Sequence, residues 1–440
     1  MEFFDKLVIP QSLEHIQLLK SLSVVTLLIL LPYLGVLLSS SFLSIIFFKK
    51  GKGTGNKIHL KFSKDLIDLI TVNKSSAIGL SLVPMLSFLF LYAQLLQGSK
   101  ASISSNLFII ILITVVALFA IYLYKYSFQS VKVLNAASVK ENESNPEFEG
   151  KVHYLLGVFG VILLLIASYL FIGIIQFLGD SSRWNGGNSI QNLIFSTETL
   201  IYFLYFLSTS ISLTAAYVLY KYLKSGYNAD EDFKDYVDNF SLKTAMVFIL
   251  VQPLLLIVSV ISIPSSSLSN GTFIYASLIL MILLIISIFL YFMLRESHLK
   301  YRNSVMFLVL GLFVFMVLIE QGSFNTASQL QDRVLEAKYA SFQKEFKSSL
   351  GIKTEASVSG EAIFKVKCRA CHSFDKKIVG PPYNETLPQF VNNMSGLEDF
   401  IAHPRKINPD YPAMPDQGLK PNEVKAIASY IMETFKKNKK

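Results

Sequence analysis

The sequence predicts an all-α membrane protein, with a bundle of about eight transmembrane helices followed by an extracytoplasmic C-terminal domain. Of the 440 residues, 52% are hydrophobic and only 16% are charged, and the mean hydropathy is +0.48. Soluble domains are about a quarter charged. Eight apolar runs reach the length of about 20 residues that a helix needs to cross a bilayer. The runs do not alternate with period two, which excludes strands and a β-barrel.

The first apolar run is interpreted as a retained helix rather than a cleavable signal peptide. It is longer than the hydrophobic part of a signal peptide, and the residues before it are not a basic region. That segment mixes both charges: Glu2, Asp5, Lys6 and Glu14. The eight runs lie at 17–47, 77–97, 104–126, 153–178, 194–221, 243–264, 272–294 and 304–322.

The charges in the connecting loops predict the orientation of these helices. Four alternate loops hold 18 Lys and Arg residues, whereas the other three short loops hold only Lys100 and Arg183. The positive-inside rule places the four basic loops in the cytoplasm. We therefore expect a protein of the inner (cytoplasmic) membrane, with its N-terminus and its C-terminal domain on the periplasmic side. The orientation of the helices explains the excess of Lys and Arg over Asp and Glu, and no nucleic-acid partner is expected.

Composition also divides the part of the chain that follows the last run. Apolar residues recur at helical spacing over 324–348, which predicts a helix leaving the membrane. Residues 349–360 contain Gly, Ser and Thr and are typical of a link. The predicted divisions are a transmembrane domain at 1–322, a helical stalk and linker at 323–357, and a C-terminal domain at 358–440.

The C-terminal domain contains the motif Cys368-Arg369-Ala370-Cys371-His372. These are the only two cysteines of the chain, and no His pair with zinc-finger spacing accompanies them. The spacing CxxCH is the attachment signal for a c-type haem, in which both thiols bind the porphyrin and the histidine binds the iron. A plain redox dithiol is the alternative. The motif predicts one covalent haem c.

From Gly360 to the C-terminus, about 80 residues, the chain resembles the class I cytochrome c family. Gly380-Pro381-Pro382-Tyr383 is similar to the family's proximal loop, and Tyr411-Pro412-Ala413-Met414-Pro415 to its distal methionine loop. A closing helix, PNEVKAIASYIMETF, follows. Tyr383 departs from the pattern, since small cytochromes usually carry Leu there. Residues 1–322 are not assigned to a family.

The resemblance implies the ligands of the haem iron. His372 and Met414 would bind the metal, and the Pro381 carbonyl would accept the Nδ1 proton of His372 and fix its tautomer. Met394 and His403 are alternative distal ligands. Met414 is preferred because the prolines beside it stiffen the loop that presents its sulfur.

Six-coordinate iron with His and Met ligands has no open position for a substrate, so we predict electron transfer and no catalytic residues. The expected function is a membrane-bound c-type cytochrome subunit that relays single electrons at the periplasmic face. It is an electron-transfer subunit rather than a catalytic chain on its own. Expected partners are other subunits of a respiratory or photosynthetic complex, with a soluble electron carrier or an oxidase as a further candidate.

The alternative is a quinol-oxidising or terminal-oxidase-like subunit with haem b or quinone in the membrane. His153 and His298 could share such a haem near the cytoplasmic surface, although two separate interfacial histidines are the simpler interpretation. His15, Glu198 and Glu320 could form a polar cluster near the outer surface, because ionisable residues in spans are candidates for function.

Overall fold

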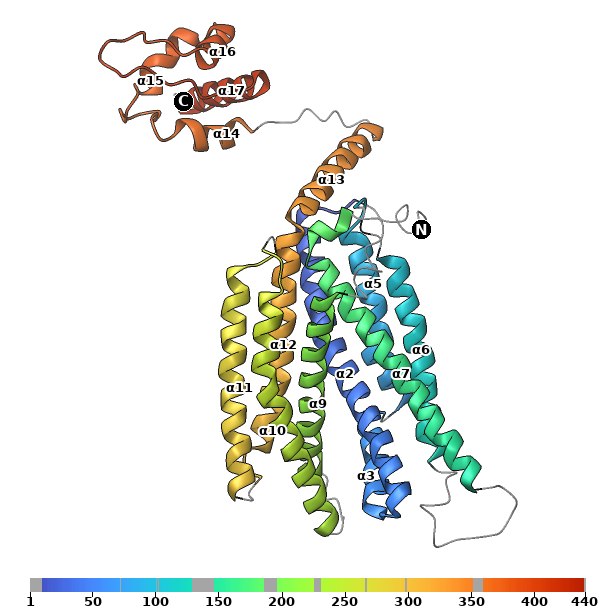
Figure 1. The fold of residues 1–440 in the computed structure, drawn as a ribbon. Coiled ribbons are helices and arrows are strands. Elements are labelled where there is room, and N and C mark those ends of the chain that lie inside the picture. Colours follow the sequence, from blue (N-terminus) through green and yellow to red (C-terminus); the bar gives the residue numbers. More distant parts are fainter. Residues whose placement is uncertain are drawn as a thin grey trace. The chain divides into compact units, whose positions relative to one another are not determined.

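A computed structural model describes residues 10–71, 73–99, 101, 103–128, 146–185, 196–224, 231–265, 267–296, 299–350 and 359–438. All regular elements in these ranges are helical (Figure 1). The chain forms two compact units, Met1–Ala340 and Ser341–Lys440. The first contains the long apolar helices and the second a set of short helices. The predicted fold class is confirmed.

Eight helices of the described ranges are long and apolar enough to cross a membrane, and each overlaps most of one predicted run. They are α2 (Leu13–Thr54), the joined segments α4 (Lys74–Ala77), η1 (Ile78–Leu82) and α5 (Val83–Leu95), then α6 (Ser104–Ser127), α7 (Pro146–Leu178), α9 (Thr197–Lys224), α10 (Glu231–Ile261), α11 (Asn270–Glu296) and α12 (Arg302–Ala327).

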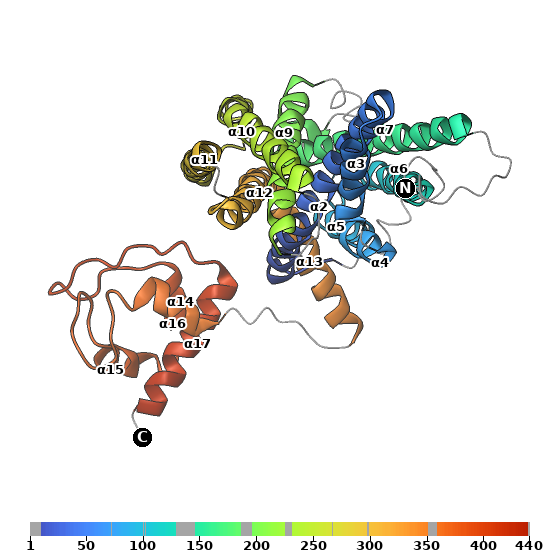
Figure 2. The same cartoon turned by 90° about the horizontal axis from the view of Figure 1, so that it is seen from below.

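Helix α2 is the centre of the bundle. It contacts α5 and α7 on one side and α9 and α12 on the other (Figure 2). Small residues allow this close approach, as is usual between membrane helices. A Cβ atom added to Gly35 would collide with the side chain of Ser210 on α9. One turn further along α2, the hydroxyl of Ser39 bonds to the Ser210 carbonyl (3.2 Å) and to the Thr214 hydroxyl.

The loop expected between the first two spans contains a helix that the sequence did not reveal, α3 (Lys57–Ile70). It packs against the end of α2, where the rings of Phe47 and Phe62 lie 4.8 Å apart. The seven lysines of this segment suggested a solvated loop. The buried residues of α3 nevertheless recur every three or four positions, so the segment is an amphipathic helix.

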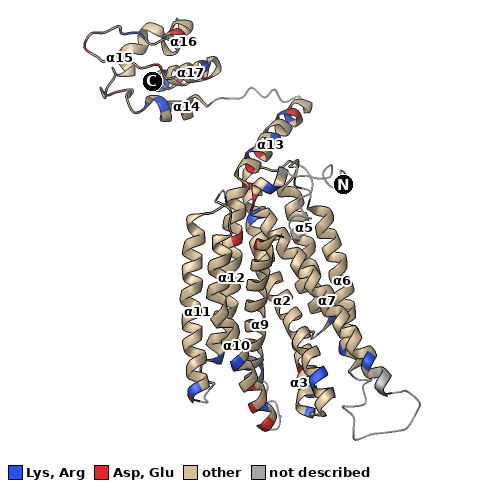
Figure 3. Ribbon diagram, viewed as in Figure 1, with Lys and Arg blue, Asp and Glu red and all other residues tan. Residues whose placement is uncertain are grey.

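Charged residues are unevenly distributed over the bundle. Lys and Arg gather at the end opposite α13 (Gln329–Ser349), the helix that follows α12 (Figure 3).

The helix predicted at 324–348 consists of the end of α12 and most of α13. The start of α13 is fastened to α2, because the Lys20 ammonium lies 2.6 Å from the Asp332 carboxylate and 2.7 Å from the Ser328 hydroxyl.

The second unit is built from short helices around a small core. They are α14 (Gly360–Ile363), η4 (Phe364–Cys368), α15 (Tyr383–Thr386), η5 (Leu387–Phe390), α16 (Met394–Ala402) and α17 (Pro421–Asn438). Helices α14 and α16 both contact α17. One face of α17 forms part of this core, since Val424, Ile427 and Ile431 are all buried.

Candidate functional site

The two cysteines and the histidine of the CxxCH motif lie on one turn at the end of η4. The backbone N–H groups of Cys371 and His372 both donate to the Cys368 carbonyl, at 3.1 and 2.9 Å. Cys368 is buried, Cys371 is half-buried, and both are free thiols. Segment η4 is a π-helical turn, a feature that is frequent at functional sites.

The thiols have the properties of attachment points rather than of a redox dithiol. Burial, with the neighbouring Cys371 as a smaller cause, raises the pKa of the Cys368 thiol to about 11. Reactive CxxC pairs have the opposite shift, because the thiolate is their nucleophile. At neutral pH, Cys368 is therefore a protonated, weakly nucleophilic thiol. This raised pKa differs from that of a reactive CxxC dithiol.

The imidazole of His372 is held by the loop that follows it. The N–H of Gly380 donates to the Cys371 carbonyl at 2.9 Å and folds the loop back onto the motif. Nδ1 of His372 then lies 3.3 Å from the Pro381 carbonyl. A Cβ atom at Gly380 would collide with the imidazole. The Tyr383 ring stacks on the other side, with centroids 5.0 Å apart and planes 10° apart.

This arrangement fits a metal-binding histidine. Burial lowers the pKa of His372, against a smaller opposing effect of the Pro381 hydrogen bond. The neutral imidazole is therefore favoured, and this is the form that binds metal. With Nδ1 engaged by the carbonyl, Nε2 is the nitrogen left for a ligand.

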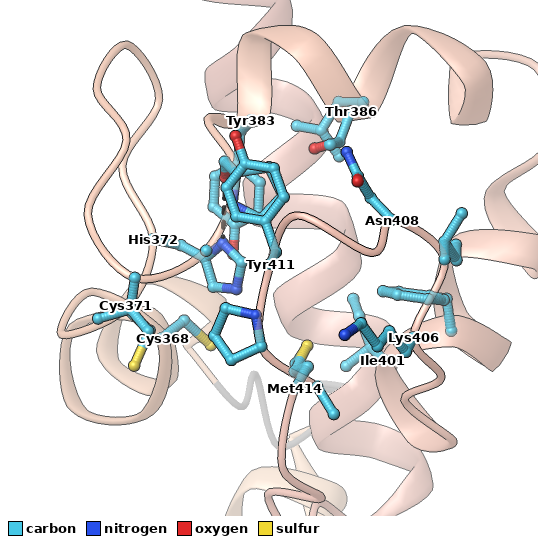
Figure 4. A pocket seen from close by; sticks show the side chains of 18 of the residues that line it. Cys368, Cys371, His372, Tyr383, Thr386, Ile401, Lys406, Asn408, Tyr411 and Met414 are labelled. Atoms are coloured by element: carbon cyan, nitrogen blue, oxygen red, sulfur yellow. Dashed lines mark hydrogen bonds between the residues drawn. The ribbon is translucent and has the colours of Figure 1, made fainter.

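A cavity of about 540 Å³ opens beside the motif. Pockets for cofactors typically measure about 300–1,000 Å³. In Figure 4, the CxxCH side chains lie on one side of this cavity and Met414 on the other. Apolar walls come from Leu397 and Ile401, and the polar rim includes Lys406 and Asn408.

The placement of the three distal candidates differs. Met414 is half-buried and lines the cavity, in the irregular segment between α16 and α17. Among the described residues around the cavity it is the one methionine. Met394 instead opens α16 and packs against the domain core. The side chain of His403 is 79% exposed and lies 3.3 Å from Asp399. The arrangement favours Met414.

One further side chain at the cavity, Lys377, was not identified from the sequence. It lies over the Tyr411 ring, 4.5 Å from its centroid, and both residues line the cavity. Tyr411 belongs to the predicted distal loop, whereas nothing local in the sequence indicates Lys377. Two thiols, an oriented imidazole, a thioether and a cavity of suitable size together fit a covalently attached haem.

Comparison with known proteins leads to the same conclusion. Residues 355–431 match the family described as subunit III of the cbb3-type cytochrome c oxidase. Cytochrome c-551 of Pseudomonas denitrificans is 35% identical over 78 residues, which cover 17% of this chain and 95% of that protein. Cytochrome c-551 of Azotobacter vinelandii is 29% identical over 79 residues, with the same coverage.

Through its C-terminal domain, the chain belongs to the class I c-type cytochromes. The predicted family is thereby confirmed, and its members' covalent haem c is the cofactor implied for this cytochrome domain. No solved structure was found to match the chain.

The structure gives no support to a second haem in the bundle of this cytochrome. His153 is buried, with Nδ1 at 2.5 Å from the Ser127 hydroxyl. The rings of Phe48, Tyr124 and Phe128 each lie 4.4 Å from it, centroid to centroid. The imidazole is thus packed among aromatic rings and is buried rather than exposed. His298, its proposed counterpart, lies outside the described residues.

The expected outer polar cluster is divided into separate groups. Glu198 binds Arg183 at 3.2 Å, and His15 is exposed. Glu320 is buried, and its Oε1 accepts a hydrogen bond of 3.1 Å from Gln176. In the described residues, no group of three or more His, Cys, Asp or Glu side chains could hold a metal ion.

Proposed function

We propose that this protein is a membrane-bound cytochrome subunit of an electron-transport complex, which relays single electrons through one covalent haem c at the periplasmic face. The observation that carries the proposal is the convergence of Cys368, Cys371, His372 and Met414 on one cavity. These residues lie in a domain similar to small cytochromes c-551. When bound, the haem supplies a one-electron couple at its iron.

Each residue of the site has a defined part in this function. Cys368 and Cys371 would hold the haem through thioether bonds. His372 would bind the iron through Nε2, while the Pro381 carbonyl fixes the imidazole plane. Met414 would be the second side chain to bind the iron, and a methionine ligand in place of a second histidine raises the reduction potential. With His372 and Met414 both bound to the iron, no site would remain for a substrate.

The charges at the end of the bundle and around the cavity support the proposed location and partners. The basic end of the bundle lies opposite α13, as expected for cytoplasmic loops and a periplasmic haem domain (Figure 3). The matching family is named for a subunit of a terminal oxidase, which supports a respiratory complex. The charged residues that line the cavity are more often basic than acidic: Lys367, Lys377, Arg405 and Lys406 against Glu385 and Asp410. A rim of this charge would favour an acidic donor or acceptor.

The proposal is tested in membranes of the native organism. The haem c of this chain should be reduced when quinol is supplied and reoxidised when the terminal acceptor is added. The matched control replaces Cys368 and Cys371 by Ala, which removes this haem from the spectrum. A haem that stays in one redox state while the membranes respire would contradict the proposal.

A further inference from the structure

Glu320 is a carboxylic acid buried in the membrane bundle, and it has no part in the haem site. Its exposed fraction is 6%. It lies on α12, seven residues before the helix ends at Ala327, which corresponds to about 10 Å along the axis. Within the described parts of the chain, no Lys, Arg or His forms an ion pair with it. An unpaired carboxylate at such a place is costly, so the neutral acid is favoured.

The partners of Glu320 are uncharged hydrogen-bonding groups from two other helices. The side-chain N–H of Gln176 on α7 donates to Oε1 at 3.1 Å. The hydroxyl of Tyr202 on α9 also bonds to the carboxyl group. An amide and a phenol satisfy a protonated carboxyl group, but they supply no charge to balance an ionised one. The geometry therefore suits a group that holds a proton.

A small cavity adjoins the carboxyl group. Its volume is about 10 Å³, and Glu320, Tyr92 and Gln321 line it together with apolar side chains. A volume of about 10–15 Å³ is what one water molecule needs. The cavity is too small for a quinone or a larger ligand. It can hold the single water that passes a proton to or from the acid.

Polar side chains continue from this cavity toward the end of the bundle where α13 begins. The hydroxyl of Ser23 on α2 donates to Oε1 of Gln321 at 3.0 Å. The amide of Gln321 donates to Asn325 at 2.9 Å. Three residues beyond Asn325, the Ser328 hydroxyl meets the Lys20 ammonium at the start of α13. Hydrogen bonds thus link Ser23, Gln321 and Asn325, and these polar groups lie between the cavity and the end of the bundle where α13 begins.

We infer that Glu320 is a proton-binding site of the membrane bundle, which exchanges its proton with the water at the α13 end through the groups around Gln321. The inference goes beyond the proposed electron relay and does not depend on the haem. Helices α7, α9 and α12 meet at this acid, so its protonation state is coupled to their packing.

Other titratable groups near this site are uncharged or already paired. Tyr92 on α5 and Tyr202 and Tyr205 on α9 are buried phenols. Two sets of charged groups toward the α13 end are ion-paired. They are Lys20 with Asp332, and Arg183 with Asp180 and Glu198. None of these charged groups is therefore placed to balance the charge of an ionised Glu320.

Infrared spectroscopy of the full-length protein in liposomes tests the inference. The difference between the native protein and Glu320→Gln should contain the C=O stretch of a protonated carboxylic acid at neutral pH. This band should shift in D₂O, because the proton exchanges. The matched control is Glu198→Gln, at the exposed, Arg183-paired carboxylate on α9, which should give no such band. An absent band, or a band that does not shift in D₂O, would overturn the inference.

A second measurement needs no variant and covers the case in which Glu320→Gln does not fold. Dicyclohexylcarbodiimide reacts with protonated carboxylic acids in apolar surroundings. Peptide mass spectrometry of the treated native protein should find the adduct on Glu320 and not on Glu198. Labelling should decline as the pH is raised. Labelling of Glu198 with none on Glu320 would contradict a protonated Glu320.

Discussion

The membrane bundle and the cytochrome domain are both helical, but they are stabilised in different ways. The bundle consists of helices of 22 residues or more, whose contacts depend on small residues and on hydroxyl hydrogen bonds such as Ser39 to Ser210. The cytochrome domain has helices of 4 to 18 residues around a cavity of about 540 Å³. A domain of about 80 residues has a small core, and such domains often need a covalent cross-link or a bound metal to be stable. A covalent haem would therefore add to the stability of the cytochrome domain, whereas the bundle already has an extensive core of its own.

The largest expected effect is the loss of covalent haem from the cytochrome domain, with no change in the membrane bundle. Replacing Cys368 and Cys371 by Ala should abolish covalent haem and destabilise the cytochrome domain, because both thioether bonds are lost. The helices of the bundle should still insert into the membrane, and the same segments of the bundle should resist protease. Haem staining of a denaturing gel and limited proteolysis in membranes measure the two results. Haem that survives denaturation in this variant would contradict the assignment.

The next effect concerns the distal ligand. Met414→Ala should keep the haem attached but lose the charge-transfer band of Met-ligated ferric iron. The reduction potential should fall by on the order of 0.1 V or more, within the range of about 0.8 V that axial ligands span. Spectroelectrochemical titration measures the shift. Met394→Ala is the matched control, since Met394 lies in the domain core. A fall in potential with Met394→Ala but not with Met414→Ala would reverse the assignment.

A smaller effect compares one glycine from each region. Gly380→Ala should displace the His372 ring and destabilise the haem-loaded domain by about 1–3 kcal/mol, as overpacking does. Gly311 on α12 has open space around its Cα, so Gly311→Ala should be neutral or slightly stabilising. Thermal denaturation followed by haem absorbance and by helix content measures both. Equal effects of the two substitutions would argue against the close contact at His372.

The smallest expected effect is on the stability of the membrane bundle. Ser39→Ala removes the bonds to Ser210 and Thr214, and it should cost about 0.6 kcal/mol, the typical value for such bonds between membrane helices. Ser87 bonds only to a carbonyl of its own helix and is exposed, so Ser87→Ala is the control and should change nothing. Unfolding in mixed micelles compares the two. A loss of several kcal/mol for Ser39→Ala would mean that the α2–α9 contact depends on more than this bond.

Local signals explain what the sequence predicted well. The eight spans follow from the length of apolar runs, and the CxxCH motif needs only five residues in a row. The amphipathic helix α3 was missed because the lysines around it indicated a connecting loop, although its own three lysines occupy one face. The sequence also could not show that aromatic rings enclose His153, since Phe48 and Tyr124 come from other helices. The same holds for the contact of Lys377 with Tyr411 at the cavity.

The central claim is the proposal that this chain carries one covalent haem c. The most direct test is a pyridine haemochrome spectrum of the purified full-length protein, with the haem counted per chain. The account predicts one haem c and no haem b. A protein without haem c, or with haem b in stoichiometric amount, would contradict it.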